Sequence, residues 1–430
     1  TCALGLCYEL GTGVEADPAR AVELYREAAE QGYAQAQCNL GFCLYRGIGT
    51  PEDGAQAAEW FAKAAQAGHA RAQQLLGECY ERGCGVECSP EKAAELYRQA
   101  HEQHYPAGTC SLGMCYEFGR GVERDPERAV QLYREAAERD SAWAQCNLGF
   151  CYYQGIGVEM DDAEAVKWFT KAAAQGSARA HFLLGECHEY GYGVEENADQ
   201  AARLYRVAHE GGYAPGTCSL GLCYEMGAGV AQDKEEAARL YRLAADMGNA
   251  RAQCNLGFFY YHGITVEEDT EQAAAWFAKS AAQGHHRAEF LLGECYENGY
   301  GVKKSPIKAV ELYTLAHKGG HLDGTCALGR CRAAGLGVDR DEAKAAALYA
   351  QAAEQGSAQG MYLLGQCYEQ GRGVDQDVDK ARELYRKAAD KQYEKARQAL
   401  DRLSAPRAPQ AAEQPKAKAK RGFRWPFGKK

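Results

Sequence analysis

Cysteine offers the widest chemistry in this sequence, because a thiol can bind a metal, form a disulfide or act as a nucleophile. Seventeen of the 19 cysteines fall into two columns that recur at multiples of 36 residues, one beginning at Cys2 and the other at Cys7. On one helix these two positions are separated by roughly 7.5 Å along the axis and about 140° around it, which is too far apart for a disulfide. Other copies of the columns carry aromatic residues, such as Phe182 and Phe259. We therefore expect buried, reduced thiols.

One irregular cluster, Cys79, Cys84 and Cys88, interrupts this regularity. A zinc site requires four ligands, usually as closely spaced pairs. The cluster offers three cysteines without that pairing, so the sequence predicts no metal and no cofactor.

Two Ser-x-x-Lys segments, Ser89 to Lys92 and Ser305 to Lys308, match the nucleophile motif of penicillin-recognising enzymes. Both serines fall where a helix is expected to begin, and a serine at that place is explained by capping. The other motifs of those enzymes are missing from the sequence. We therefore predict no catalytic residue.

The elements that position these residues follow from a 36-residue period. The Leu-Gly dipeptide recurs eleven times from Leu4 to Leu364 at steps of 36 residues. A glycine seven residues after each leucine ends a first helix. An Asp, Asn or Ser six residues later caps a second helix, whose buried stripe carries Ala and then Tyr or Phe, as at Ala21 and Tyr25. The pattern predicts an all-α solenoid of helix-turn-helix repeats.

This pattern resembles the Sel-like repeat (SLR), a relative of the tetratricopeptide repeat. The resemblance covers residues 1–403 and implies a right-handed α-α superhelix used as an adaptor or scaffold. Residues 404–430 then form a separate basic tail that we expect to be disordered. Because some SLR relatives have been called β-lactamases, a β-lactamase-like hydrolase is the alternative function.

A second period of 108 residues makes three kinds of repeat recur, and it repeats one possible binding surface three times. On the first helices, the residues two and five after the leucine point away from the leucine face, and Asn precedes the leucine in every third repeat. These positions predict an acidic groove with aromatic pockets for a partner protein or peptide, suited to a basic, extended segment. The predicted groove residues are Asn39, Phe42, Tyr45, Glu78, Glu81, Asn147, Phe150, Tyr153, Glu186, Glu189, Asn255, Phe258, Tyr261, Glu294 and Glu297. Packing between repeats, for the phenylalanines, and a solvated face, for the glutamates, explain about half of these residues without a partner.

Charge separates the tail from the rest of the chain. The whole chain has a net charge of −10, and residues 404–430 carry eight Lys/Arg against one Glu, which leaves −17 for the remainder. An acidic solenoid argues against nucleic-acid binding. The tail is equally compatible with contact to an anionic membrane, with docking into the groove and with an inert role. Its candidate contact residues are Lys420, Arg421, Phe423, Arg424, Trp425 and Phe427.

Location follows from the cysteines and the hydropathy. The apolar runs are far shorter than the roughly 18–20 residues that a membrane-spanning helix needs, so we expect no transmembrane segment. Reduced thiols favour the cytoplasm. The sequence begins Thr1-Cys2-Ala3 inside a repeat, so an N-terminal signal removed earlier is compatible with it.

Overall fold

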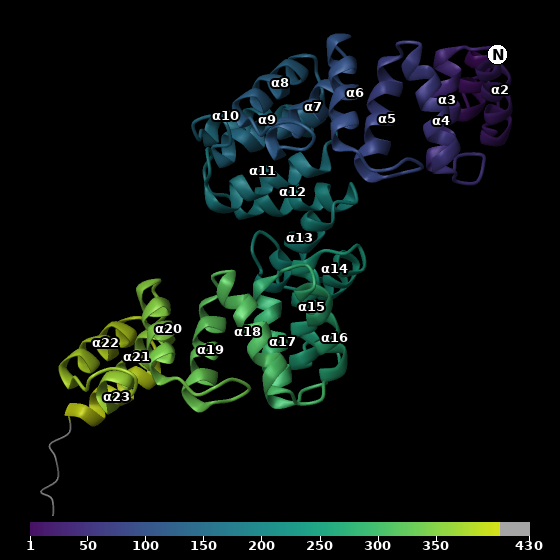
Figure 1. Ribbon diagram of the computed structural model, residues 1–430. Coiled ribbons are helices and arrows are strands. Elements are labelled where there is room, and N and C mark those ends of the chain that lie inside the picture. Colours follow the sequence, from purple (N-terminus) through teal and green to yellow (C-terminus); the bar gives the residue numbers. More distant parts are fainter. Residues whose placement is uncertain (405–430) are drawn as a thin grey trace, which may run out of the picture. The chain divides into compact units, whose positions relative to one another are not determined.

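The computed structural model describes residues 1–404, which form 23 α-helices and no strand (Figure 1). The predicted tail beyond Ser404, with all of its candidate contact residues, lies outside the described residues. The helices are α1 (Cys2–Leu10), α2 (Pro18–Glu30), α3 (Ala34–Arg46), α4 (Gly54–Gln66), α5 (Ala70–Arg82), α6 (Pro90–Glu102), α7 (Pro106–Phe118), α8 (Pro126–Glu138), α9 (Ala142–Gln154), α10 (Asp162–Ala174), α11 (Ala178–Tyr190), α12 (Ala198–Glu210), α13 (Ala214–Met226), α14 (Lys234–Asp246), α15 (Ala250–His262), α16 (Thr270–Ala281), α17 (His286–Asn298), α18 (Pro306–Lys318), α19 (Leu322–Ala334), α20 (Glu342–Glu354), α21 (Ala358–Gln370), α22 (Val378–Asp390) and α23 (Glu394–Ser404).

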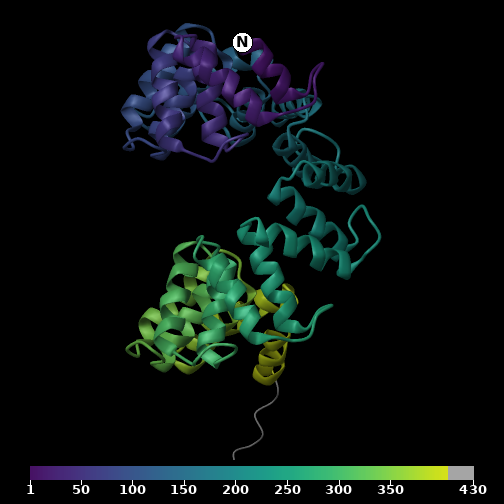
Figure 2. The same cartoon turned by 90° about the vertical axis from the view of Figure 1, so that its right-hand side faces the viewer.

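The chain divides into two compact units, Thr1–Trp276 and the residues from Phe277 onward, with the division inside α16. Within each unit a helix lies beside the one that precedes it and the one that follows it in the sequence (Figures 1 and 2). Odd-numbered helices are the first helices of the repeats and even-numbered helices are the second. The predicted all-α solenoid of eleven 36-residue repeats is confirmed.

Capping begins and ends the helices where the sequence predicts. Asp17 accepts a hydrogen bond from the backbone amide of Arg20 at 3.0 Å, and the same bond forms at all eleven cap positions. The first helices end at a left-handed glycine, such as Gly47 with φ 66°. The second loop glycine lies against the preceding repeat: a methyl group on Gly85 would be 2.0 Å from the carbonyl oxygen of Gly54.

The glycine of the Leu-Gly dipeptide brings the two helices of a repeat together. A methyl group on Gly113 would lie 2.7 Å from the Cε1 atom of Tyr133, closer than atoms pack. The equivalent glycines of nine other repeats face the ring of their own second helix at similar distances. The rings are buried, and those of Tyr133 and Phe169 are fully so. Close approach of the first helix to this ring is therefore what fixes the spacing of the two helices.

Replacing Gly113 with Ala should destabilise the protein, although Ala is the better helix former by roughly 1 kcal/mol. The clash with Tyr133 requires a displaced ring or backbone, which costs about 1–3 kcal/mol. Denaturant unfolding followed by circular dichroism measures the loss. Gly54→Ala is the matched control, because the nearest atom to a methyl group there is 3.5 Å away. Equal effects of the two substitutions would contradict this account of the Leu-Gly dipeptide.

Candidate functional site

The predicted groove residues lie on first helices of both units. Asn39, Phe42 and Tyr45 are on α3, and the other residues of the first unit are on α5, α9, α11 and α15. Glu294 and Glu297 are on α17 in the second unit. Within the first unit α5, α7 and α9 pack side by side across repeats, and this contact brings several of the predicted residues together.

The glutamate at position five after the leucine belongs to a hydrogen bond inside its own repeat. Tyr97 donates its hydroxyl to Glu81 at 3.1 Å, and Tyr133 donates to Glu117 at 2.6 Å. The ring lies on the glycine at position one, and position five is one helical turn further along, which places the carboxylate at the end of the ring. Seven repeats make this bond, through Glu9, Glu81, Glu117, Glu189, Glu225, Glu297 and Glu369.

Where position five is tyrosine, the ring of the second helix has no hydroxyl. Tyr45 packs edge-on against Phe61 with ring centroids 6.3 Å apart, and Tyr153 against Phe169 at 6.4 Å. In the sequence, ten of the eleven repeats carry one of two pairs, Glu with Tyr or Tyr with Phe, and the tenth repeat has Ala333 with Tyr349. Position five, predicted to line the groove, instead pairs with this ring, and the two columns change together in the sequence.

The glutamates at position two are partly buried. Burial raises the pKa of Glu78 and of Glu294. Burial and the neighbouring Glu189 raise the pKa of Glu186 to about 7. Glu78 also accepts a hydrogen bond from Gln74 at 2.6 Å. These carboxyl groups are therefore weaker negative charges than the sequence implied.

The asparagines before the leucine already have protein partners. Asn147 accepts from Arg179 at 2.6 Å and donates to the Cys110 sulfur at 3.5 Å. Asn39 accepts from Gln35 at 3.0 Å. The guanidinium of Arg179 lies 5.3 Å from the centre of the Phe150 ring. A partner would have to displace these contacts to use the asparagine amides.

A groove runs over α5, α7 and α9, and two cavities with common walls form it. The first has a volume of about 360 Å³ and the second about 170 Å³, and both are lined by Met114 and Trp143. We call this surface the α5–α9 groove. Its other lining residues are Glu78, Glu81, Arg82, Tyr97, Ser111 and Arg120 in the first cavity, and Glu117, Phe118, Tyr133, Asn147, Phe150 and Arg179 in the second.

The charge of the α5–α9 groove differs from the acidic groove that the sequence predicted. Three glutamates face three arginines, and Arg120 forms an ion pair with Glu81 at 2.9 Å. Arg120 stands between two loop glycines of the next repeat, and Arg179 is in the first turn of α11, so neither lies at the positions from which the groove was predicted. Trp143, 40% exposed, was missed for the same reason. Of the predicted residues, Glu78, Glu81, Asn147 and Phe150 share this groove.

The two Ser-x-x-Lys segments occupy helix starts. Ser89 accepts from the backbone amide of Lys92 at 3.4 Å, and the Lys92 ammonium lies 5.1 Å from the centre of the Tyr80 ring. Ser305 and Lys308 have the same arrangement, with the ammonium over Tyr296. In both copies the lysine ammonium is directed to an aromatic ring and makes no hydrogen bond with the serine hydroxyl. A lysine base is therefore not in place to take a proton from that hydroxyl.

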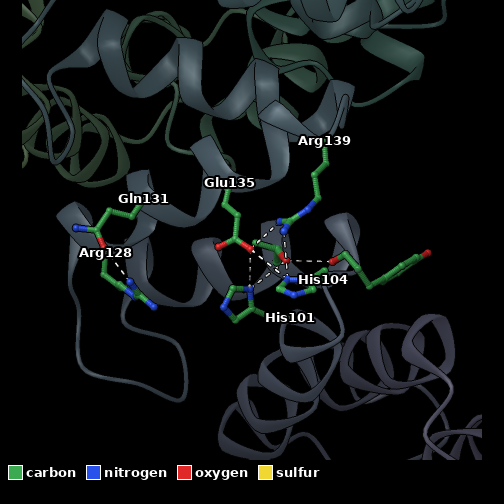
Figure 3. Close-up of polar contacts among 8 residues, drawn as sticks. His101, His104, Arg128, Gln131, Glu135 and Arg139 are labelled. Atoms are coloured by element: carbon green, nitrogen blue, oxygen red, sulfur yellow. Dashed lines mark hydrogen bonds and ion pairs between the residues drawn. The ribbon is translucent and has the colours of Figure 1, made fainter.

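A polar cluster joins the end of α6 to α8, as Figure 3 shows. The His101 Nδ1 atom lies 3.2 Å from the Thr109 hydroxyl and 3.9 Å from the Glu135 carboxylate. Glu135 also pairs with Arg139 at 2.6 Å. The histidine–threonine contact recurs at 3.0 Å in the two equivalent repeats. It therefore belongs to the packing of every third repeat.

The cysteine columns are buried as expected. All column members are buried except Cys2 and Cys7 in α1, and all 19 cysteines are free thiols. Burial raises the pKa of Cys43 to about 12 and that of Cys38 to about 11, so the nucleophilic thiolate is disfavoured. Among the described residues no group of three or more His, Cys, Asp or Glu side chains is placed to hold a metal ion. Within residues 1–404 no helix has the length and apolar character to cross a bilayer.

Comparison with known proteins agrees with the repeat geometry. A family model described as the Sel1 repeat matches eleven consecutive segments, from residues 1–33 to residues 358–393. A protective antigen of uropathogenic Escherichia coli strains with an SLR fold is 32% identical, with a TM-score of 0.60 over 89% of this chain and 82% of that one. A Sel1 repeat protein from Oxalobacter formigenes is 31% identical over 72% of this chain and 91% of that one, with a TM-score of 0.48. No curated protein matches the sequence.

Removing the Tyr133 hydroxyl should destabilise the first unit, because the Glu117 carboxylate, 8% exposed, loses its donor. We expect Tyr133→Phe to cost about 1–3 kcal/mol. Installing the other natural pair, Glu117→Tyr with Tyr133→Phe, should recover part of this loss, giving a coupling energy of at least about 1 kcal/mol in a double-mutant cycle. Tyr349→Phe is the matched control, since Ala333 stands at position five of that repeat. Similar losses for Tyr133→Phe and Tyr349→Phe would refute the role of the carboxylate.

Glu186→Gln should stabilise the protein at pH 8 and change little at pH 5. The pKa of Glu186 is about 7 in the folded chain and about 4.3 in an unfolded chain. The folded state therefore retains a proton that the unfolded state has lost, and this stabilisation, complete below about pH 4, disappears as the pH rises through 7. Glutamine has no proton to lose, so the gain at pH 8 should be about 1–2 kcal/mol after allowance for partial exposure.

Thermal unfolding at the two pH values measures this difference. The exposed Glu195 supplies the control substitution, Glu195→Gln. An equal change in the midpoint at pH 5 and pH 8 for Glu186→Gln would count against ionisation as the cause.

Proposed function

This chain belongs to the Sel1 repeat family, and we propose that it is a protein–protein interaction scaffold that binds an extended segment of a partner protein in the α5–α9 groove. Proteins of this family are commonly interaction scaffolds. The observation that carries the proposal is the exposure of Trp143 at the junction of the two cavities. Tryptophan and arginine side chains dominate the binding energy of many interfaces, and this groove contains both.

The lining of the α5–α9 groove defines the chemistry of the segment. Met114, Trp143 and Phe150 offer an apolar surface for one or two apolar side chains of the partner. Glu81 is already neutralised by Arg120, so Glu78 is the carboxyl group that remains for a basic side chain. Burial raises the pKa of Glu78, and an approaching Lys or Arg would lower it again. The proposed occupant is therefore an apolar segment with a basic residue.

Arg179 supplies a second element of recognition. It covers the Phe150 ring and bonds Asn147, so it holds both predicted residues in place before a partner arrives. A groove whose side chains are already fixed loses less conformational entropy on binding. Asn147 and Phe150 then act through their contact with Arg179, and a partner carbonyl could take the place of the Asn147 oxygen on the guanidinium.

Trp143→Ala and Glu78→Gln should each abolish or strongly weaken partner capture. Loss of a central tryptophan in an interface costs about 2 kcal/mol or more, which is roughly thirtyfold in affinity. Leu243→Ala is the control, because Leu243 is also 40% exposed but lies on a second helix. Affinity capture with the full chain, followed by mass spectrometry, identifies proteins held by the wild type and by Leu243→Ala.

The proposal requires that those same proteins be lost from both groove variants. Circular dichroism and the unfolding midpoint establish that the variants are folded. Undiminished capture by folded Trp143→Ala and Glu78→Gln proteins would place the binding surface elsewhere.

A further inference from the structure

The repeat formed by α19 and α20 departs from the Glu–Tyr rule. Its second helix carries Tyr349, whose ring lies against Gly329 as in the other repeats, but position five is Ala333. Tyr349 is buried, with 4% of its surface exposed. Its hydroxyl makes no hydrogen bond to any of the described residues. The seven other tyrosines at this position that face a glutamate all donate to it.

A cavity occupies the place of the missing carboxylate. It has a volume of about 220 Å³, and its lining residues come from α19, α20, α21 and the loops that follow α19 and α21. Ala333, Tyr349 and Arg372 line it, and its other polar or charged lining residues include Arg340, Glu342 and Gln366. We call it the Ala333 cavity. Arg340 is paired with Glu342 at 2.5 Å, whereas the Arg372 guanidinium has no hydrogen bond or ion pair with the described residues.

The first unit contains the same site with its carboxylate present. Arg120 stands between the two loop glycines of its repeat, as Arg372 does in the last repeat. There, Glu81 accepts from the Tyr97 hydroxyl at 3.1 Å and from Arg120 at 2.9 Å. The Ala333 cavity has both donors, the Tyr349 hydroxyl and the Arg372 guanidinium, but Ala333 stands where Glu81 supplies the acceptor. A carboxylate bound in the Ala333 cavity would meet the same two donors.

Four departures at this junction remove an acid or add a cation, and a fifth adds an acid: the cavity-lining Glu342 stands where the corresponding repeats have proline or lysine. The 108-residue period places Glu117 and Glu225 at the position of Ala333, and Ile156 and Ile264 at the position of Arg372. Two further apolar or aromatic columns become arginine in the same helix, at Arg330 and Arg332. These residues replace Leu or Met, and Tyr, in the three corresponding repeats. One acid is lost, three cations are gained and Glu342 adds one acid, so the net change at these five positions is positive. Of the three added arginines, only Arg372 lines the cavity.

We propose that the Ala333 cavity binds a carboxylate, held by the Tyr349 hydroxyl and the Arg372 guanidinium. A guanidinium and a phenol are hydrogen-bond donors that suit a carboxylate, because hydrogen bonds to an ionised acceptor are stronger than neutral ones. The proposal goes beyond the partner segment of the α5–α9 groove, because this site selects a group of opposite charge in a different unit. The carboxylate comes from a small acid or from a polypeptide, either at its C-terminus or on an acidic side chain.

The test follows the Tyr349 hydroxyl directly. In the full chain labelled with ¹³Cζ-tyrosine, the Tyr349 resonance is identified by its loss in Tyr349→Phe. Sodium acetate, compared with sodium chloride at equal ionic strength, should move this resonance in a saturable manner. The Tyr97 resonance should stay in place, because Glu81 already occupies that site. At about 100 mM acetate a site with a Kd on the order of 10 mM is roughly nine-tenths filled.

Three variants separate specific binding from a nonspecific salt effect. Ala333→Glu supplies the carboxylate covalently, so it should displace the Tyr349 resonance without acetate, abolish the acetate response and raise the unfolding midpoint by about 2–4 °C. Ala333→Gln should fill the space without the charge and leave a smaller displacement. Arg372→Gln should weaken acetate binding about tenfold. No movement of the Tyr349 resonance at 100 mM acetate, or an undiminished response in Ala333→Glu, overturns the proposal.

Short peptides then distinguish the sources of the carboxylate. An N-acetylated trialanine with a free C-terminus binding more tightly than acetate, and than its own C-terminal amide, identifies a polypeptide end. A peptide with both ends blocked and one internal Asp, if it binds more tightly than acetate, identifies an acidic side chain. Binding of acetate with no gain from any peptide identifies a small acid. These measurements do not involve Trp143 or Glu78. The result of the partner-capture experiment therefore does not affect the conclusion on carboxylate binding in the Ala333 cavity.

Discussion

In ten repeats of this chain, the aromatic ring of the second helix lies on the glycine that follows the recurring leucine of the first helix. A methyl group on Gly77 would be 2.5 Å from the Tyr97 ring, and the same is found at Gly149 against Phe169 at 2.7 Å. The absence of a side chain at one position thus sets how closely two helices approach. Since a repeat buries its apolar face only against its neighbours, an error in this distance would be passed along the stack. The ring-on-glycine contact is therefore the constraint from which the other distances follow.

The first consequence is a restriction on the residue type at position five, one helical turn beyond the glycine. The end of the ring reaches that residue, so a tyrosine hydroxyl needs an acceptor there and a phenylalanine needs a hydrophobic or aromatic neighbour. Glu117 with Tyr133 and Tyr153 with Phe169 are the two solutions. A mixed pair, such as a buried glutamate beside a phenylalanine, would leave a polar group without a partner. This requirement explains why the two columns change together.

The sequence was sufficient for the fold, because its signals are local. Leu-Gly spacing, the caps at Asp17 and its equivalents, and the ring at Tyr25 each depend on a few neighbouring residues, and the structure confirms them. The groove was harder to predict because it depends on distances between repeats. Glu81 was assigned to a solvent-facing groove, whereas its carboxylate holds Tyr97 and Arg120. Arg179 and Trp143 were missed because each belongs to the first helix of the following repeat. Arg179 of α11 covers Phe150 of α9, and Trp143 of α9 lines the groove beside Met114 of α7. Both placements depend on how the repeats stack.

Uniform packing also determines where such a repeat protein can vary its chemistry. The glycine, the ring and the caps cannot change without a loss of stability, but position five and the residue between the loop glycines meet at the open end of the ring. Glu81 with Arg120 neutralises that meeting point, Tyr153 with Tyr192 makes it aromatic at a ring distance of 5.7 Å, and Ala333 with Arg372 leaves it open and cationic. All three use the same backbone. Selectivity for a partner can therefore be altered repeat by repeat at these two columns, because neither residue takes part in the contact that spaces the helices.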